Sequence, residues 1–263
     1  MIAALQMYDW PEVAARTDAF WADVSAALAA EGLAAPRSLA RPAEPAEAWG
    51  DSALLLGQSC GLPYVSGRCG GAVAVARPVY ASEGCGAGTY RSALVCRAGE
   101  EAPLESFRGR VAAVNEYGSQ SGCNALADAV RPLGDAFFAD VVPTGAHRAS
   151  ALAVAWGNAD IAAIDAVAWA LFGEIEPAAR DRLAVLGWTV EMPALPFITA
   201  GGHAGRAPAV LRALARAARP GNATGLPVGV LPAIDSDYDP IRAMASRVQG
   251  LRLAPAAPPL GAH

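Results

Sequence analysis

Short hydrophobic runs, polar glycine-containing loops and helix-like segments follow one another in a fixed order through the middle of the chain. The hydrophobic runs cover residues 111–115, 138–142 and 161–164, and each leads into a segment with apolar residues spaced for one face of a helix. Repeated strand, loop and helix of these lengths predict βαβ units with a parallel sheet and right-handed crossovers. Because ligands bind at the carboxyl ends of such strands, the loops are the first candidates for function.

The same patterns predict further elements on both sides of this block. Strands are expected at residues 2–5, 52–56, 72–80, 89–97, 183–190 and 197–199, and helices are expected from Pro11 onward and over 208–218 and 239–248. The composition of 254–263 is typical of a disordered tail. Polar or proline-containing stretches near 97–103 and 188–193 predict two crossings, with residues 1–98 and 190–263 in one lobe and 99–189 in the other.

Composition excludes several functional classes. With 54% hydrophobic and 17% charged residues, the 263-residue chain can bury a substantial core. A net charge of −5 argues against nucleic acid as a partner, because phosphate backbones require clustered cations. No run reaches the roughly 18–20 apolar residues of a membrane helix, so no direct membrane insertion is expected.

The first residues and the cysteines bear on the cellular compartment. The amino terminus has no basic n-region, so the chain as written is not expected to be exported. Five cysteines, at positions 60, 69, 85, 96 and 123, fit neither complete disulfide pairing nor close metal-ligand spacing. The sequence also has no other cluster of metal ligands, and we expect no metal and no cofactor.

The loops of the central block carry side chains suited to an anion. Gly118 and Gly122 allow backbone N–H groups to approach a ligand at a helix start, where the helix dipole also favours negative charge. Ser119 and Ser121 add hydroxyl donors, and His147, in the first turn of the next helix, adds a ring nitrogen. The pattern predicts an anion site.

Asp165, at the end of the third run, narrows the kind of anion that is expected. An ionised carboxylate repels a bare phosphate dianion. It therefore favours a ligand that carries its own proton or amine, or else it orients His147.

Polar residues also follow the strands of the first predicted lobe. They are Tyr8, Asp9, Gln58, Ser59 and Tyr64. Their side chains suit hydrogen bonding to a polar ligand. Asp9 fits the role of helix N-cap equally well, and an N-cap at Ser59 explains part of the pattern, so the sequence leaves both interpretations open.

Five segments together resemble one protein family. They are GRVAAVN at 109–115, GSQSG at 118–122, TGAH at 144–147, GNADIAAID at 157–165 and MPALPF at 192–197. In order and spacing they resemble the phosphate/phosphite/phosphonate-binding proteins of ABC importers, over most of the chain. The resemblance implies an α/β, two-lobed fold like that of type 2 periplasmic binding proteins, with two hinge crossings and a ligand cleft between the lobes.

The resemblance also implies which residues bind the ligand. By position, the oxyanion would be held by Ser119, Gln120, Ser121 and His147. Asp165 and, more loosely, Tyr64 and Tyr90 would complete the cleft. Tyr8, Gln58 and Ser59 remain candidates from their positions after the strands of the first lobe. Gln120 stands where the family usually has a small hydroxyl residue, which leaves the identity of the oxyanion open.

The implied function is that of a solute-binding protein for a small oxyanion or organophosphonate-like ligand, with an ABC permease as partner and no enzymatic activity. The family is periplasmic, whereas the missing leader favours the cytoplasm. A cytosolic enzyme, for example of cofactor biosynthesis, and a ligand sensor on the same fold are therefore alternatives. The sequence shows no closely spaced acid pair that would support the enzyme.

Overall fold

Most of the hydrophobic runs become strands of two five-stranded sheets in the computed structural model, which describes residues 1–254. Each of these sheets belongs to its own compact unit. Unit 1 consists of Met1–Arg91, Ala166–Leu171 and Glu191–Ala243, and unit 2 consists of Ser92–Asp165, Phe172–Val190 and the segment from Met244 onward. Because these segments alternate along the chain, it passes between the units five times.

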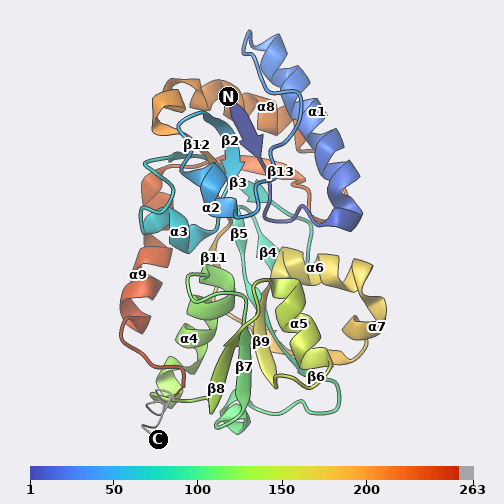
Figure 1. The fold of residues 1–263 in the computed structure, drawn as a ribbon, viewed down its shortest axis with the longest axis vertical. Coiled ribbons are helices and arrows are strands. Elements are labelled where there is room, and N and C mark those ends of the chain that lie inside the picture. The colour runs from blue at the N-terminus through green and yellow to red at the C-terminus, as the bar shows by residue number, and fades with distance from the viewer. Residues whose placement is uncertain (255–263) are drawn as a thin grey trace, which may run out of the picture. The chain divides into compact units, whose positions relative to one another are not determined.

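Unit 1 is built on a sheet with the strand order β1-β2-β12-β3-β13 (Figure 1). These strands are β1 Ile2–Ala4, β2 Leu54–Gln58, β12 Phe197–Thr199, β3 Val73–Val79 and β13 Gly229–Pro232. β1 and β2 are parallel, and the other neighbours are antiparallel. A second, small sheet contains β11 Met192–Pro193, β5 Thr89–Tyr90 and β4 Cys85–Gly86.

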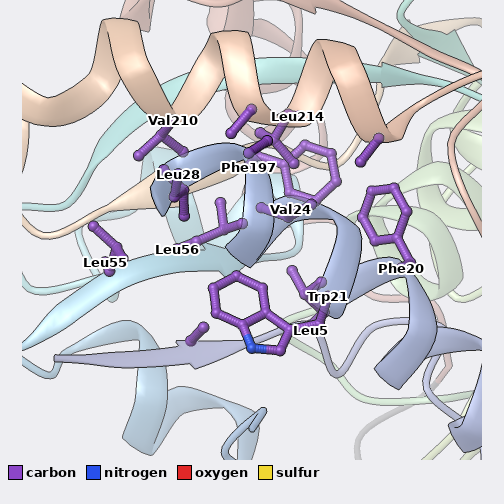
Figure 2. Packing of buried hydrophobic residues seen from close by; sticks show 14 of the residues in the cluster. Leu5, Phe20, Trp21, Val24, Leu28, Leu55, Leu56, Phe197, Val210 and Leu214 are labelled. Atoms are coloured by element: carbon purple, nitrogen blue, oxygen red, sulfur yellow. The ribbon is translucent and has the colours of Figure 1, made fainter. Parts of the chain in front are cut away.

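Helices α1 (Ala14–Ala30) and α8 (Ala207–Ala217) supply much of the core of unit 1 (Figure 2). Phe20, Val24 and Leu28 recur at every fourth position of α1, which places them on one face of the helix. Their cluster also includes Leu5, Trp21, Leu55, Leu56, Phe197, Val210 and Leu214. The indole N–H of Trp21 donates to the carbonyl of Pro36 at 3.2 Å, so this large buried ring leaves no polar atom unpaired.

Unit 2 is built on a sheet with the strand order β10-β6-β9-β7-β8. The strands are β10 Leu183–Trp188, β6 Ser92–Arg97, β9 Ile161–Asp165, β7 Val111–Val114 and β8 Asp140–Pro143. β7 is parallel to both β8 and β9, as the strand-loop-helix pattern predicted, whereas β6 and β10 are antiparallel to their neighbours. The core of this unit includes Leu126, Phe137, Phe138 and Ile161.

Shorter helices connect the strands. The α-helices are α2 Pro45–Trp49, α3 Gly61–Val65, α4 Ala125–Val130, α5 His147–Ala155, α6 Ala166–Ile175, α7 Pro177–Arg180 and α9 Asp239–Val248. The 3-10 and π turns are η1 Pro11–Val13, η2 Leu104–Phe107, η3 Gln120–Asn124, η4 Arg131–Leu133, η5 Gly201–Arg206 and η6 Asp235–Tyr238. Within residues 1–254, no helix combines the length and the apolar character needed to cross a bilayer.

The predicted lobe boundary at residue 98 is wrong, because the single strand expected over 89–97 is two strands. β5 pairs within the small sheet of unit 1, whereas β6 pairs with β9 and β10 in unit 2. The stretch 97–103 is not a crossing, since the N–H of Ala98 donates to the carbonyl of Arg182 within unit 2 at 2.8 Å. The return at Val190–Glu191 lies inside the predicted crossing at 188–193.

The C-terminal segment also lies in a different unit from the one predicted. The carbonyls of Arg252 and Leu253 accept hydrogen bonds from the N–H groups of Ala136 and Phe138, at 2.7 and 2.8 Å. Arg252 also pairs with Asp135. Residues 244–254 therefore belong to unit 2, and residues 255–263 of the predicted disordered tail lie outside the described residues.

Candidate anion-binding site

Strands β7, β8 and β9 end at the same edge of the unit 2 sheet, because all three run in parallel. β7 leads into η3, and β8 leads into α5. The first turns of η3 and α5 therefore start from one edge, which carries the predicted contacts of the central block.

Ser119 caps the first of these turns. Its Oγ accepts a hydrogen bond from the N–H of Gly122 at 3.0 Å, and its carbonyl accepts one from the N–H of Asn124 at 3.0 Å. Backbone N–H groups in the first turn of a helix have no carbonyl partner within that helix. The N–H of Ser121 is such a group, and it is the kind of donor that binds anions at helix starts.

Ser121 and His147 meet at this edge of the sheet. Oγ of Ser121 lies 2.7 Å from Nε2 of His147, and Oγ of Ser119 lies 3.5 Å from Oγ of Ser121. His147 is the first residue of α5, whose N-cap residue, Ala146, provides no side-chain cap. The structure thus brings together Ser119, Ser121 and His147, three of the residues selected from the sequence.

His147 is uncharged at neutral pH in this environment. Desolvation lowers the pKa of His147 to about 4, although the backbone carbonyl of Ala163 acts in the opposite direction. Part of the residue reaches the surface, but its Nδ1 atom is buried. Nε2, which lies at Ser121, is therefore the ring nitrogen placed at this edge of the sheet, and in the neutral ring it can act as donor or acceptor.

Asn115, directly after β7, lies in the same place. A Cβ atom on Gly122 would fall 1.8 Å from Oδ1 of Asn115 and 3.3 Å from Cε1 of His147, so only glycine fits there without displacing Asn115. Oδ1 of Asn115 is itself buried without a hydrogen bond. Asn115 was not selected from the sequence, although its place at the end of a predicted strand was a signal for a candidate site residue.

Asp165 and Ser92 lie opposite each other on β9 and β6, and both are buried. The hydroxyl of Ser92 donates to the carbonyl of Ser121 at 2.9 Å, and the N–H of Ser92 donates to Oγ1 of Thr189 at 2.9 Å. This pair of strands therefore connects the position of Asp165 to η3. Ser92 and Thr189 were not selected from the sequence, because each lies within a predicted strand and belongs to no motif.

The amide of Gln120 is engaged inside unit 2. Its Oε1 accepts a hydrogen bond from Nδ2 of Asn124 at 3.1 Å, and its Nε2 lies 3.0 Å from the sulfur of Met244. The side chain is fully buried. In this arrangement the amide shapes the turn, whereas the sequence had predicted an amide donor to the ligand.

Comparison with known families gives a direct assignment. One family model matches residues 2–220, and its description is ABC transporter, phosphonate, periplasmic substrate-binding protein. The chain belongs to this family. The matched range contains all ten predicted contact residues. No protein of curated function matches the sequence.

Solved structures show the fold of this phosphonate-binding family member. A binding protein component of an ABC phosphonate transporter from Pseudomonas aeruginosa has a TM-score of 0.72 and 15% identity, with 95% of this chain and 86% of that chain covered. PhnD1 from Prochlorococcus marinus in complex with methylphosphonate has a TM-score of 0.74 and 14% identity, covering 95% and 98%. XAC2383 from Xanthomonas citri bound to ATP has a TM-score of 0.67 and 13% identity, covering 94% and 97%. The predicted type 2 periplasmic-binding-protein fold is confirmed.

Two of the ligand contacts predicted on unit 1, Tyr8 and Gln58, lie together beside Tyr80. Nε2 of Gln58 donates to the hydroxyl of Tyr80 at 2.9 Å, and the ring of Tyr80 stands edge-on to that of Tyr8, with centroids 5.4 Å apart. Together they line a cavity of about 20 Å³, which is room for about one water molecule. Tyr80, at the end of a predicted strand, was not selected from the sequence.

Three further predicted contacts lie in the interior of unit 1. Ser59 is buried, and its N–H donates to the carbonyl of Pro196 at 3.1 Å. The hydroxyl of Tyr64 accepts a hydrogen bond from the N–H of Ala74 at 3.2 Å, and burial raises the pKa of Tyr64 to about 12. Tyr90 is buried in β5. For these residues a ligand contact stays a prediction.

The capping roles considered for Asp9 and Ser59 are not seen. The N-cap residue of η1 is Trp10, and the carboxylate of Asp9 instead pairs with Arg41 at 2.6 Å. The N-cap residue of α3 is Cys60, one residue beyond Ser59.

Proposed function

We propose that this protein is the substrate-binding component of an ABC importer and that it binds a phosphonate, or a closely related phosphorus oxyanion, at the unit 2 edge. The observation that carries the proposal is the contact between Ser121 and His147, which joins the first turns of η3 and α5. Hydroxyl, imidazole and backbone N–H donors converge there, and an oxyanion offers several acceptor oxygens to such donors. Ser119, Ser121 and His147 are the proposed direct contacts, and Gln120 contributes through its backbone.

The charge of the surroundings narrows the proposed ligand. His147 is neutral at pH 7, and the buried carboxyl of Asp165 lies in register with Ser92, which contacts the Ser121 carbonyl. A second negative charge raises the desolvation cost, and neutral donors offset that cost less well than a cation does. The proposed ligand is therefore a singly charged phosphonate, or one whose organic substituent carries an amine.

Binding without chemical conversion is the proposed mode of action. General acid–base catalysis is most effective when the pKa of the group lies near the working pH, whereas the pKa of His147 is about 4. We accordingly propose that the ligand leaves the site unchanged, that the protein acts in the periplasm, and that its protein partner is an ABC permease.

Isothermal titration calorimetry with methylphosphonate, 2-aminoethylphosphonate, phosphite, phosphate, sulfate and ATP tests the ligand class. At least one phosphonate is expected to bind with a Kd well below 1 mM, which corresponds to about 4 kcal/mol. Sulfate is expected to bind more weakly, because it is doubly charged at neutral pH. Tight binding of ATP without binding of any phosphonate would contradict the proposal.

His147→Ala tests the site in the same assay. The variant is expected to lose about 1.5–3 kcal/mol of binding free energy, the range for a hydrogen bond to a charged group. His203→Ala is the matched control, because the ring of His203 lies 3.1 Å from the carbonyl of Leu54 in unit 1. Unchanged affinity in His147→Ala would remove this residue from the site.

Phosphorus NMR of the protein with each phosphonate tests the absence of chemistry. The ligand signal is expected to stay constant over many hours. Appearance of a product that is missing in the His147→Ala sample would favour an enzyme instead.

The contacts predicted on unit 1 are Tyr8, Gln58, Ser59, Tyr64 and Tyr90. Tyr8→Phe removes only a hydroxyl, and Gln58→Ala removes the amide that bonds to Tyr80. A loss of affinity in either variant, with unchanged thermal stability, would identify that residue as a contact.

A further inference from the structure

Ser92 contacts η3 and lies next to one of the passages between the units, and it also contacts Thr189, which lies near another. It is the first residue of unit 2 after Arg91, and Thr189 lies just before the return at Val190–Glu191. Both residues are buried. Neither belongs to a motif in the sequence.

Two hydrogen bonds join Ser92 to Thr189, and a third joins Ser92 to η3. The N–H of Ser92 donates to Oγ1 of Thr189, the N–H of Thr189 donates to the carbonyl of Ser92, and the hydroxyl of Ser92 donates to the carbonyl of Ser121, each at 2.9 Å. A continuous set of contacts therefore runs from Thr189 through Ser92 to Ser121, and from Ser121 to His147.

The peptide group between Ser121 and Gly122 is held at both of its ends. Ser92 donates to its carbonyl, and its N–H donates to Oγ of Ser119. A peptide group is planar, so these two bonds fix its rotation about the chain direction. The orientation of the Ser121 side chain follows from that of its backbone.

We propose that Ser92 is a positioning residue for the anion site, and that it links the order of the η3 turn to the order of the backbone at Ser92 and Thr189. The link between ligand binding and Thr189 rests on the proposed function. The link between Ser92 and η3 does not, because it exists in the protein without ligand.

Residue-resolved amide hydrogen exchange by NMR on the ligand-free protein tests the link between Ser92 and η3. Ser92→Ala is expected to accelerate exchange at Gly122 and Asn124 about five- to tenfold relative to the amides of β7, since one buried hydrogen bond is lost. Cys96→Ala is the matched control, because this buried side chain lies on the same strand and bonds only to the carbonyl of Arg97 in the described contacts. Equal exchange at Gly122 in the two variants would overturn the proposal.

Repeating the exchange measurement with saturating methylphosphonate tests the link between ligand binding and Thr189. In the wild type, Gly122 and Thr189 are both expected to gain protection. In Ser92→Ala, only Gly122 gains it, and the affinity falls about three- to tenfold. Equal protection of Thr189 in both proteins would overturn the link. Absence of protection at Gly122 in the wild type would count against the proposed function, and the ligand-free comparison would still decide the role of Ser92.

Discussion

The protonation of His147, in the candidate anion site, should make the stability of the protein depend on pH. Desolvation lowers the pKa of His147 from its ordinary 6.5 to about 4, so between these values the unfolded chain binds a proton that the folded protein does not. The free energy of unfolding should therefore decrease as the pH falls from 6.5 to 4, by roughly 3 kcal/mol, and this contribution should be constant below pH 4. Urea unfolding of the wild type and His147→Gln over this pH range measures it.

His203→Gln provides the control for that experiment. This variant should keep the pH profile of the wild type, whereas His147→Gln should lose the decrease between pH 6.5 and 4. If the His147→Gln and wild-type profiles have the same slope, the folded protein protonates His147 at an ordinary pKa and the site is more hydrated than the structure indicates.

Gly122 leaves no room for a larger side chain beside the candidate anion site. Gly122→Ala would place its Cβ 1.8 Å from Oδ1 of Asn115, so the Asn115 side chain must move. We expect methylphosphonate binding to weaken at least about tenfold and the free energy of unfolding to fall by about 1–3 kcal/mol. Gly187→Ala in β10 is the control, because its Cβ would meet nothing within 4 Å. Similar effects in both variants would mean that the crowding at Gly122 has no special role.

The sequence predicted those candidate site residues that occur in motifs at helix starts. Ser119, Ser121 and His147 have this property, and the structure brings them together. Ser92 could not be identified in this way, because its role depends on strand pairing that carries no local signal. The direction of the Gln120 amide was likewise not predictable, since one of its partners, Met244, is 124 positions away.

At the scale of elements, Asp160 fixes the starts of β7 and β9. Its Oδ2 accepts a hydrogen bond from the N–H of Val111 at 2.9 Å, and its Oδ1 accepts one from Arg97 at 2.7 Å. Burial acts to raise the pKa of Asp160, but the Val111 N–H and Arg97 outweigh it, and the pKa lies below its usual value. Asp160→Asn should lower the free energy of unfolding by about 1.5–3 kcal/mol, measured by urea unfolding at pH 7.

The pH dependence of stability and a variant of Glu100 provide two checks on this prediction. Because the folded pKa of Asp160 is lowered, its contribution is present above the unfolded pKa and should disappear as the pH falls through the folded pKa. Glu100→Gln also removes a partner of Arg97, but Glu100 is exposed and its loss should be much smaller. Equal losses in the two variants would contradict the role of Asp160.

The positions of strands and helices were predictable where hydrophobic periodicity was strong. They were not predictable where the hydrogen-bond partners of the main chain decide where a strand ends. The run 89–97 breaks at Arg91 because its N–H donates to the carbonyl of Gly84 at 2.8 Å and its carbonyl accepts from the N–H of Ala166 at 3.1 Å. Those partners lie outside the ladders of β5 and β6. The residue types of 89–97 give no indication of this change of partners.

At the scale of the whole molecule, ligand binding should appear as added stability. A ligand that binds only the folded state at 100 times its Kd raises the free energy of unfolding by about 2.7 kcal/mol. We expect this increase for methylphosphonate with the wild type, measured by chemical unfolding with and without ligand, and a smaller increase for His147→Ala at the same concentration. Sodium chloride at equal ionic strength is the control, and an equal increase with this salt would show a general ionic effect.

The family and the fold were predictable because five separated segments carry recognisable residues in the right order. Membership of the two units was not predictable, because it depends on pairing between distant segments. β6 joins β9 and β10, and the segment at Arg252 joins the chain near Ala136. Neither contact leaves a periodic pattern in the sequence.

The contacts of the last described residues can form only late in the synthesis of the chain. The ribosome produces Ala136 and Phe138 long before Arg252 and Leu253, whose carbonyls satisfy their N–H groups. A translation product that stops after Val248 would contain every strand of unit 2 and still expose two backbone donors and the apolar surface against which Leu253 packs. Proteases cleave chain segments that are not held in place. A chain truncated after Val248 is therefore expected to be cleaved near Ala136 and Phe138 faster than a chain that contains Arg252 and Leu253.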